Sequence, residues 1–369
     1  MTMTRIRLLL VFFTALASGL FSLQPLGAQQ PGPQRDVADL LIQSRSMETP
    51  RAANRTIPLP AGNPLELFPI EGNVYALVGG PVNVTLQVGS EGVLLVDAGP
   101  PEMAEHVLQA VRLLTRMPIS YIVNTTADPL HYRGNAALGN EGQNPTVNQQ
   151  GLAGPGSAVA GGGGGNGPQR QAGAIVFSHE NLLNRMSAPT GETPGEPFEL
   201  WPSNTFFTPR KTMWFNDEPI EMLHVPTAHT DADMLVFFRR SDVVVAGDVI
   251  DTFRYPMIDA ARGGSIQGIL AGMNQVVDLT VPRFNQQGGT RVIPGHGRIL
   301  NEADVVEYRD MITIIHDRVK RGVDAKMTLA QIKAQQPTLD YDGLYSVPEW
   351  TGEMFVDAIY KDLTAGAAR

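Results

Sequence analysis

Cysteine is absent from all 369 residues of this chain. The fold therefore contains no disulfide bond, and no thiolate is present to act as a metal ligand or as a nucleophile. Any metal site must be built from His and carboxylate side chains. A chain without Cys suits an oxidising compartment but does not by itself indicate one.

Clusters of Lys and Arg are also lacking, and the formal net charge is −9. An acidic chain of this kind is not expected to bind nucleic acid or an anionic membrane surface. No Gly-x-Ser-x-Gly elbow of a serine hydrolase occurs, and the glycine run at residues 161–165 lacks the Lys-Ser/Thr ending of a phosphate loop. The expected partner is a small-molecule substrate.

One apolar run stands near the N-terminus, at residues 8–21. It follows Arg5 and Arg7, and a small-residue cleavage site ends at Ala28. The run is shorter than the roughly 20 residues needed to span a bilayer. These features predict a signal peptide at residues 1–28, with no integral membrane anchor after cleavage. The mature protein is expected to be exported, either to the periplasm or to the medium.

Composition divides the rest of the chain into three parts. Residues 29–65 are rich in Pro and Gln and are interpreted as a linker. Residues 66–300 carry alternating strand and helix patterns, interrupted by a flexible Gly-rich insertion at 139–173 that cannot form a core. Residues 301–369 are predicted to form a C-terminal helical extension.

Short β-rich runs bounded by turn residues predict strands, and apolar residues at helical spacing predict helices. Strands are expected at residues 73–78, 84–88, 93–96, 121–124, 174–177, 220–225, 234–238, 243–246 and 291–293. Helices are expected at residues 103–114, 265–279, 303–322, 329–335 and 352–363. Asn301 is expected to cap the third of these helices, with Asp304 in its first turn. Residues 93–124 read as a strand–helix–strand unit.

Three His residues lie where predicted strands run into loops: His131, His229 and His296. Asp248 lies at a fourth such position. Loops at strand ends are the usual place for functional sites in layered folds. Imidazole and carboxylate groups that arrive from several loops can enclose a Zn or Fe ion.

Five short motifs occur in a fixed order: Asp97-Ala-Gly, Asn124-Thr, Thr-Ala-His229-Thr, Ala-Gly-Asp248 and Pro-Gly-His296-Gly. Together they resemble the metallo-β-lactamase superfamily, over residues 67–297. The resemblance implies an α+β fold, a four-layer αββα sandwich, with one or two metal ions at the open edge between the sheets. It also implies that the metal activates a water for attack on a carbonyl or phosphoryl centre.

The main signature of that family, His-x-His-x-Asp-His, is degenerate here. Thr126, Asp128, Leu130 and His131 occupy its four positions. The resemblance then implies two ligand groups that share Asp248. One group contains Asp128 and His229, and the other contains His131 and His296.

The second group has two His and one carboxylate, a set that holds a single divalent ion. We therefore expect one ion, Zn, with Fe or Mn as alternatives. Asp128 and Asp248 are the candidate catalytic residues. Asp128 either acts as a general base or only caps the following helix. Leu130 is expected to fill with apolar atoms part of the metal cavity that the resemblance implies.

Three functions are compatible with this pattern. The first is an exported metal-dependent hydrolase that cleaves an ester, lactam or thioester bond. The second is a non-catalytic binding protein on the same scaffold, with Trp201 and Trp214 as contacts for a small molecule or partner. The third is a mononuclear iron oxidoreductase. Of the remaining His residues, His179 is expected to be structural and His224 to have a core or edge role in its strand. His106 and His316 are expected to be solvated on helices.

Overall fold

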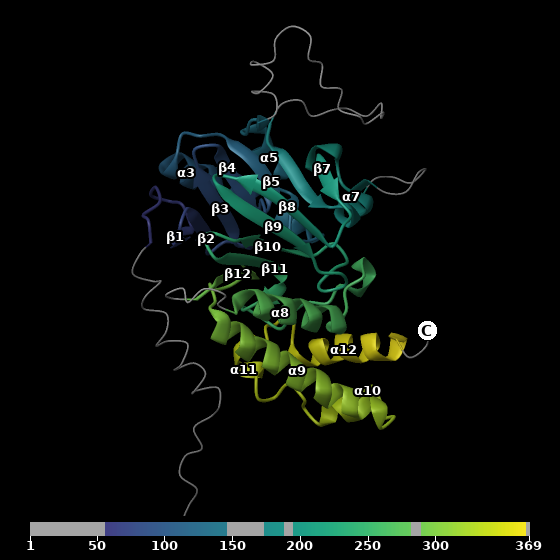
Figure 1. Cartoon of the computed structure of the whole chain (residues 1–369). Coiled ribbons are helices and arrows are strands. Elements are labelled where there is room, and N and C mark those ends of the chain that lie inside the picture. Colours follow the sequence, from purple (N-terminus) through teal and green to yellow (C-terminus); the bar gives the residue numbers. More distant parts are fainter. Residues whose placement is uncertain (1–55, 146–172, 188–194, 282–288, 367–369) are drawn as a thin grey trace, which may run out of the picture. The chain divides into compact units, whose positions relative to one another are not determined.

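The computed structural model describes residues 56–145, 173–187, 195–281 and 289–366, all within the unit Val37–Arg369 (Figure 1). The predicted signal peptide and most of the predicted linker and Gly-rich insertion lie outside these residues. Within them, no helix combines the length and the apolar composition that a bilayer span requires.

The first sheet has seven strands, ordered from β1 to β7 as in the chain. The pairs from β1 to β4 are antiparallel, and those from β4 to β7 are parallel. Its strands are β1 (Glu66–Glu71), β2 (Val74–Val78), β3 (Val84–Gly89), β4 (Gly92–Val96), β5 (Ile119–Val123), β6 (Ile175–His179) and β7 (Asn204–Phe206). The helix α3 (Ala104–Leu114) connects β4 to β5, which confirms the predicted strand–helix–strand unit.

The second sheet has five strands in the order β12-β11-β10-β9-β8. Only β11 and β12 run parallel. Its strands are β8 (Arg210–Phe215), β9 (Glu218–His224), β10 (Met234–Phe238), β11 (Val243–Asp251) and β12 (Arg291–His296).

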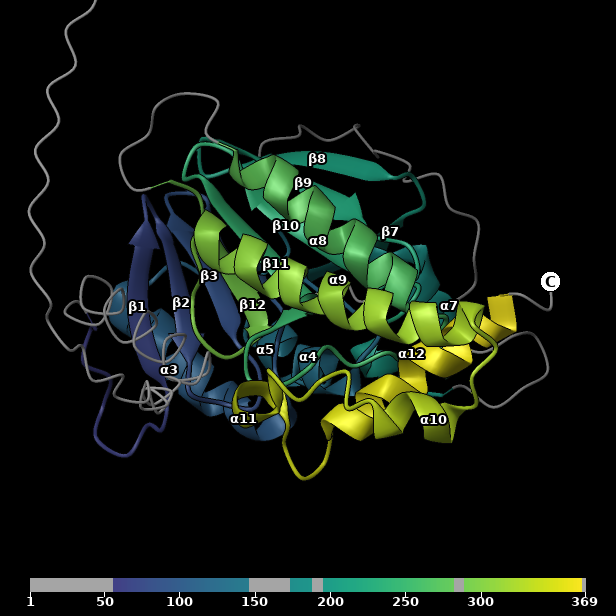
Figure 2. The same ribbon diagram turned by 90° about the horizontal axis from the view of Figure 1, so that it is seen from below.

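The longer helices lie in the second half of the chain (Figure 2). The helices besides α3 are α4 (Pro129–Tyr132), α5 (Asn135–Asn140), α7 (Glu180–Ser187), α8 (Ile266–Thr280), α9 (Glu302–Asp324), α10 (Leu329–Ala334), α11 (Asp342–Tyr345) and α12 (Gly352–Gly366). The predicted cap is confirmed. The Asn301 side chain accepts a hydrogen bond from Asp304 N at 3.0 Å, and the Asp304 carboxylate accepts one from Asn301 N at 3.0 Å.

Three apolar clusters separate four layers and confirm the αββα sandwich. The first packs α3 and α5 on the first sheet, the second fills the space between the sheets, and the third packs α8, α9 and α12 on the second sheet. Alternation along β4 explains this arrangement, because Val93 and Leu95 enter the first cluster while Leu94 and Val96 enter the second. The solvated position expected for His316 is wrong: it is buried between α9 and α8, where its Nε2 lies 2.9 Å from Gln267 Nε2.

The parallel pairs decide where the site forms. β4 and β5 lie side by side in the first sheet, and β11 and β12 do so in the second. Parallel strands end at the same edge of a sheet, so the loops that follow them are neighbours. Asp97, the loop from Asn124 to His131, and His296 all follow or end such strands.

Candidate metal centre

Asp248 stands in the middle of the site because β11 bends just before it. The register with β12 shifts between Val245 and Gly247 and again between Gly247 and Asp251. Gly247 has a φ of 51°, and a Cβ there would lie 2.5 Å from Thr125 Oγ1. Only glycine combines this left-handed backbone with so close an approach. The Ala-Gly-Asp motif is thus a local device that presents the Asp248 carboxylate.

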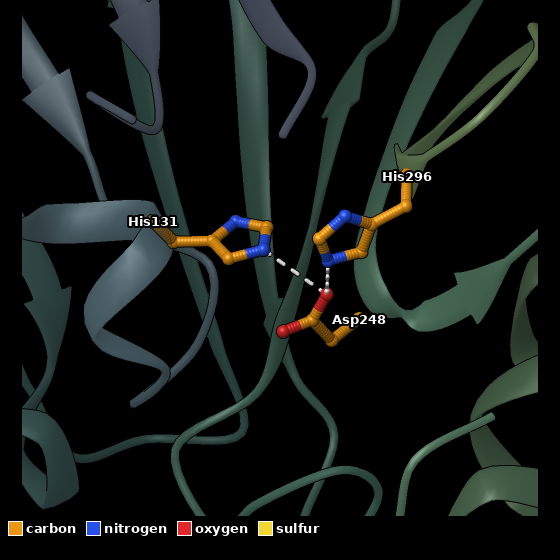
Figure 3. Close-up of side chains that lie close together, drawn as sticks. All are labelled: His131, Asp248 and His296. Atoms are coloured by element: carbon orange, nitrogen blue, oxygen red, sulfur yellow. Dashed lines mark hydrogen bonds and ion pairs between the residues drawn. The ribbon is translucent and has the colours of Figure 1, made fainter. Parts of the chain in front are cut away.

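Two imidazoles meet one oxygen of that carboxylate (Figure 3). His131 Nε2 lies 3.0 Å from Asp248 Oδ1, and His296 Nε2 lies 3.1 Å from the same oxygen. His131 is completely buried, and Asp248 is only 7% exposed. The two-His, one-carboxylate group expected from the sequence is therefore brought together.

A second group surrounds the other oxygen of Asp248. His229 Nε2 lies 3.7 Å from Asp248 Oδ2 and 3.6 Å from Asp128 Oδ2. Both separations exceed a hydrogen bond. Among the described residues His229 Nε2 is a buried nitrogen without a hydrogen-bond partner. Within each group the candidate ligand atoms lie within 4.8 Å of one another. Asp248 thus belongs to both groups, with one oxygen directed at each.

All three imidazoles are held in the same way, through Nδ1. Each Nδ1 faces an oxygen acceptor: Asp97 Oδ2 for His131 at 2.8 Å, Met257 O for His229 at 2.9 Å, and Pro81 O for His296 at 2.7 Å. A backbone carbonyl can only accept, so Nδ1 carries the hydrogen and the Nε2 lone pair is left for a ligand. Histidines that bind metals are oriented in this way.

Asp97 is a site residue that the sequence reasoning did not assign. Its Oδ2 accepts from His131 Nδ1 and from Thr125 Oγ1 at 2.7 Å, and its Oδ1 accepts from Thr125 N at 2.8 Å. A φ of 63° turns the chain at this point. The available signal was the Asp97-Ala-Gly motif itself, an Asp at the end of a predicted strand.

The buried charges of the site shift one another strongly. Burial alone would raise the pKa of Asp248, but the surrounding imidazoles, His131 first, hold it well below its usual range. Burial alone would lower the pKa of His229, but Asp128, Asp248 and Asp233 raise it to about 9. Asp248 and Asp97 likewise hold the pKa of His131 well above its usual value.

Sequence comparison identifies the family. A profile of the metallo-beta-lactamase superfamily matches residues 77–296. The chain belongs to this superfamily. No curated protein sequence matches it.

Among solved structures, a sulfatase shares the fold of this chain. The sec-alkylsulfatase Pisa1 from Pseudomonas sp. is 15% identical with a TM-score of 0.55, over 80% of this chain and 49% of that chain. The chain thus spans about half the length of the sulfatase. A metallo-beta-lactamase from Pontibacter korlensis is 15% identical with a TM-score of 0.46, over 68% of this chain and 99% of that chain.

The degenerate signature of this superfamily member can now be followed in space. Asp128 caps α4, because its Oδ1 accepts from Leu130 N at 2.8 Å, while its Oδ2 faces His229. Asp128 therefore both caps α4 and belongs to the second candidate metal group. Thr126 is completely buried. Leu130 is 41% exposed, so the expectation that it fills the interior of the site is wrong.

The other His and Trp residues singled out in the sequence of this superfamily member lie outside both candidate metal groups. His179 stacks on His224 with ring centroids 3.6 Å apart, and burial together with His224 lowers the pKa of His179 to about 4. Trp201 packs with Tyr132 in a small apolar cluster. Trp214 is 72% exposed on β8 beside Arg239, in a surface groove of about 440 Å³.

Proposed function

We propose that this chain is an exported metal-dependent hydrolase whose reaction centre is built around Asp248. One observation carries the proposal. Three imidazoles are fixed through Nδ1 so that their Nε2 atoms converge on the two oxygens of a single buried carboxylate. Metal-binding His side chains donate their other ring N–H to a carboxylate or a backbone carbonyl in this way, which fixes the direction of Nε2.

The residues present fit a divalent cation. Ligand atoms around a tetrahedral Zn lie about 3.4 Å apart, close to the separations of 3.0–3.7 Å found between the carboxylates of Asp128 and Asp248 and the imidazoles. The buried Nε2 of His229, which has no hydrogen-bond partner in the described part of the chain, is an atom that a cation would satisfy. His131, Asp248 and His296 would hold the principal ion, and Asp128 and His229 would form a weaker second position.

Zn suits this donor set, and Fe or Mn also suit two His and one carboxylate. A bound ion would supply Lewis acidity, lowering the pKa of a water and polarising a carbonyl. Asp128 would orient a water and accept its proton through Oδ2, because only its Oδ1 makes the capping hydrogen bond. Burial alone would raise the pKa of Asp128, but the His229 ring lowers it, so the carboxylate is ionised near neutral pH.

The charges near the site favour a neutral scissile group, such as an ester, lactam or thioester. Arg133, which follows α4, forms an ion pair with Glu196 at 2.9 Å. Arg254, which follows β11, is bound by Asp251 at 2.8 Å. Because both guanidinium groups already pair with carboxylates of the protein, they are poorly placed to bind an anionic ester such as a sulfate.

One observation favours a non-catalytic binding protein instead. His131, His296 and Asp248 lie at hydrogen-bond distance from one another, so this half of the site satisfies itself when the rings are protonated. An iron oxidoreductase would use the same two-His, one-carboxylate group.

Metal content separates these candidates. The mature chain, purified without chelator, is expected to carry about one equivalent of Zn, Fe or Mn, and His131→Ala and His296→Ala are each expected to lose it. His106→Ala, on α3 and outside both groups, is the matched control and should retain the metal. A wild-type chain that stays metal-free after reconstitution overturns the proposal and leaves the binding protein. The identity of the ion then distinguishes hydrolase from oxidoreductase.

Restoring the signature carboxylate tests the shape of the site. Leu130 is exposed, so Leu130→Asp should change the free energy of unfolding by no more than about 0.5 kcal/mol. If Leu130 borders the ion, the added carboxylate should raise metal affinity by about tenfold in a chelator competition. Leu130→Asn is the uncharged control, and equal affinity of the two variants would contradict the prediction. Thr126→His is expected to lower the free energy of unfolding and to add no ligand, because the Thr126 side chain is completely buried and leaves no room for an imidazole.

Export remains a prediction with a direct measurement. Expression of the full chain in a bacterial host should yield a mature N-terminus at Gln29, read by mass spectrometry of the intact protein. A chain that retains residues 1–28 in the cytoplasm would contradict it.

A further inference from the structure

The segment after β11, residues 252–259, holds His229 by both its ring and its backbone. Met257 O faces the Nδ1 of His229 at 2.9 Å. Asp259 N donates to the backbone oxygen of His229 at 3.0 Å. We call residues 252–259 the His229 support. The orientation of the ring therefore depends on where this support lies.

The His229 support is itself fastened at Tyr255, which is completely buried. The Tyr255 hydroxyl donates to Asp342 Oδ1 at 3.0 Å and lies 3.3 Å from Thr338 O. Tyr255 N donates to Tyr345 O at 3.1 Å. Burial and the Asp342 carboxylate raise the pKa of Tyr255, so the hydroxyl stays protonated and remains a donor.

Two further contacts reach the same point from other helices. Tyr308 of α9 donates to Arg254 O at 3.0 Å. Phe355 of α12 stacks on the Tyr255 ring, with centroids 5.1 Å apart and planes 9° apart. Figure 2 shows α9 beside α8, with α11 and α12 following in the same part of the molecule. All of these contacts come from residues beyond 296, where the match to the superfamily ends.

We propose that the C-terminal helices α9, α11 and α12 position the metal centre, and that Tyr255 is the positioning residue through which they act on His229. The inference rests on the proposed metal site, because it concerns the direction of a ligand atom. Only Pro256 separates Tyr255 from Met257 along the chain. A support released at Tyr255 moves the Met257 carbonyl, and a ring that loses its Nδ1 acceptor no longer directs Nε2 at Asp128 and Asp248.

The test is Tyr255→Phe in the full mature chain. This variant keeps the stacked ring and removes only the hydroxyl bonds. The first readout is made on metal-free protein: the exchange rate of the His229 Nδ1–H proton by ¹H–¹⁵N NMR, with the signal assigned by its loss in His229→Gln. Exchange should become at least about tenfold faster. The second readout is metal affinity by chelator competition, which should fall by about tenfold, as for other supports of metal ligands.

Matched controls separate positioning from general loss of stability. Tyr75→Phe makes the same change on β2, far along the chain from the site, and should alter neither readout. Val319→Ala removes buried apolar volume from α9 and should lower the melting temperature without changing the exchange of His229. Asp342→Ala removes the acceptor of the Tyr255 hydroxyl and should reproduce Tyr255→Phe.

Unchanged exchange in Tyr255→Phe overturns the inference, and so does an equal change in Val319→Ala. The NMR readout judges the inference even if the wild-type chain binds no metal. In that case the proposed function fails on metal content, while the positioning of the His229 ring is still decided.

Discussion

Asp248→Asn will abolish metal binding, taking the chain from about one equivalent to none in elemental analysis. Asp248 is the one residue common to both candidate groups, and each of its oxygens faces a different one. Asn has nearly the same shape but no charge, and one of its two terminal atoms becomes a donor that cannot bind an ion. Both positions are therefore lost with a single substitution.

Asp242→Asn is the control for this experiment. Asp242 directly precedes β11, the strand that carries Asp248, and its carboxylate accepts from Thr290 Oγ1 at 2.9 Å. The control should retain the wild-type metal content. If Asp248→Asn retained it too, the ion would have to be held elsewhere, and the candidate metal centre would be wrong.

Asp97→Asn will weaken metal binding by about 10- to 100-fold without touching an expected ligand. Asp97 accepts hydrogen bonds from the backbone and hydroxyl of Thr125 and from the ring of His131. Asn has only one accepting atom, so its amide group must meet a donor. Either His131 loses the bond that fixes its tautomer, or the loop after β5 loses its link to β4.

The same substitution should lower the free energy of unfolding by about 1–3 kcal/mol, because a buried donor is left without an acceptor. Denaturant titration of metal-free protein measures this, and chelator competition measures the affinity. Asp217→Asn is the control: Asp217 also has a positive φ, 59°, but lies exposed in the turn between β8 and β9. Wild-type affinity in Asp97→Asn would show that His131 is held without Asp97.

Elements whose signals are local were predicted well. Residues 301–304 carry their own cap, and both capping bonds span three positions. The strand β10 was predicted with its observed bounds, because its apolar run is closed by charged residues at both ends. Neighbours along the chain supply everything that such elements need.

Three strands were not predicted: β1, β7 and β8, of which β7 has only three residues. β1 contains Pro69, which removes a backbone donor and is tolerated only because β1 is at the edge of its sheet. β8 is the edge of the second sheet and begins with the exposed residues Arg210 and Lys211. Charged edge strands resist pairing with other chains, but they lack the apolar pattern by which strands are recognised.

The sequence by itself indicated the four candidate ligand positions, because His131, His229, Asp248 and His296 are chemically specific and each stands beside its own turn residues. What supports them was decided only by the tertiary structure. The acceptors of the three imidazole Nδ1 groups lie 34, 28 and 215 positions away in the chain. Two of these acceptors are backbone carbonyls. Every residue carries one, so no side-chain pattern in the sequence predicts which of them will be the acceptor. A backbone carbonyl orients an imidazole only because the fold places the two side by side.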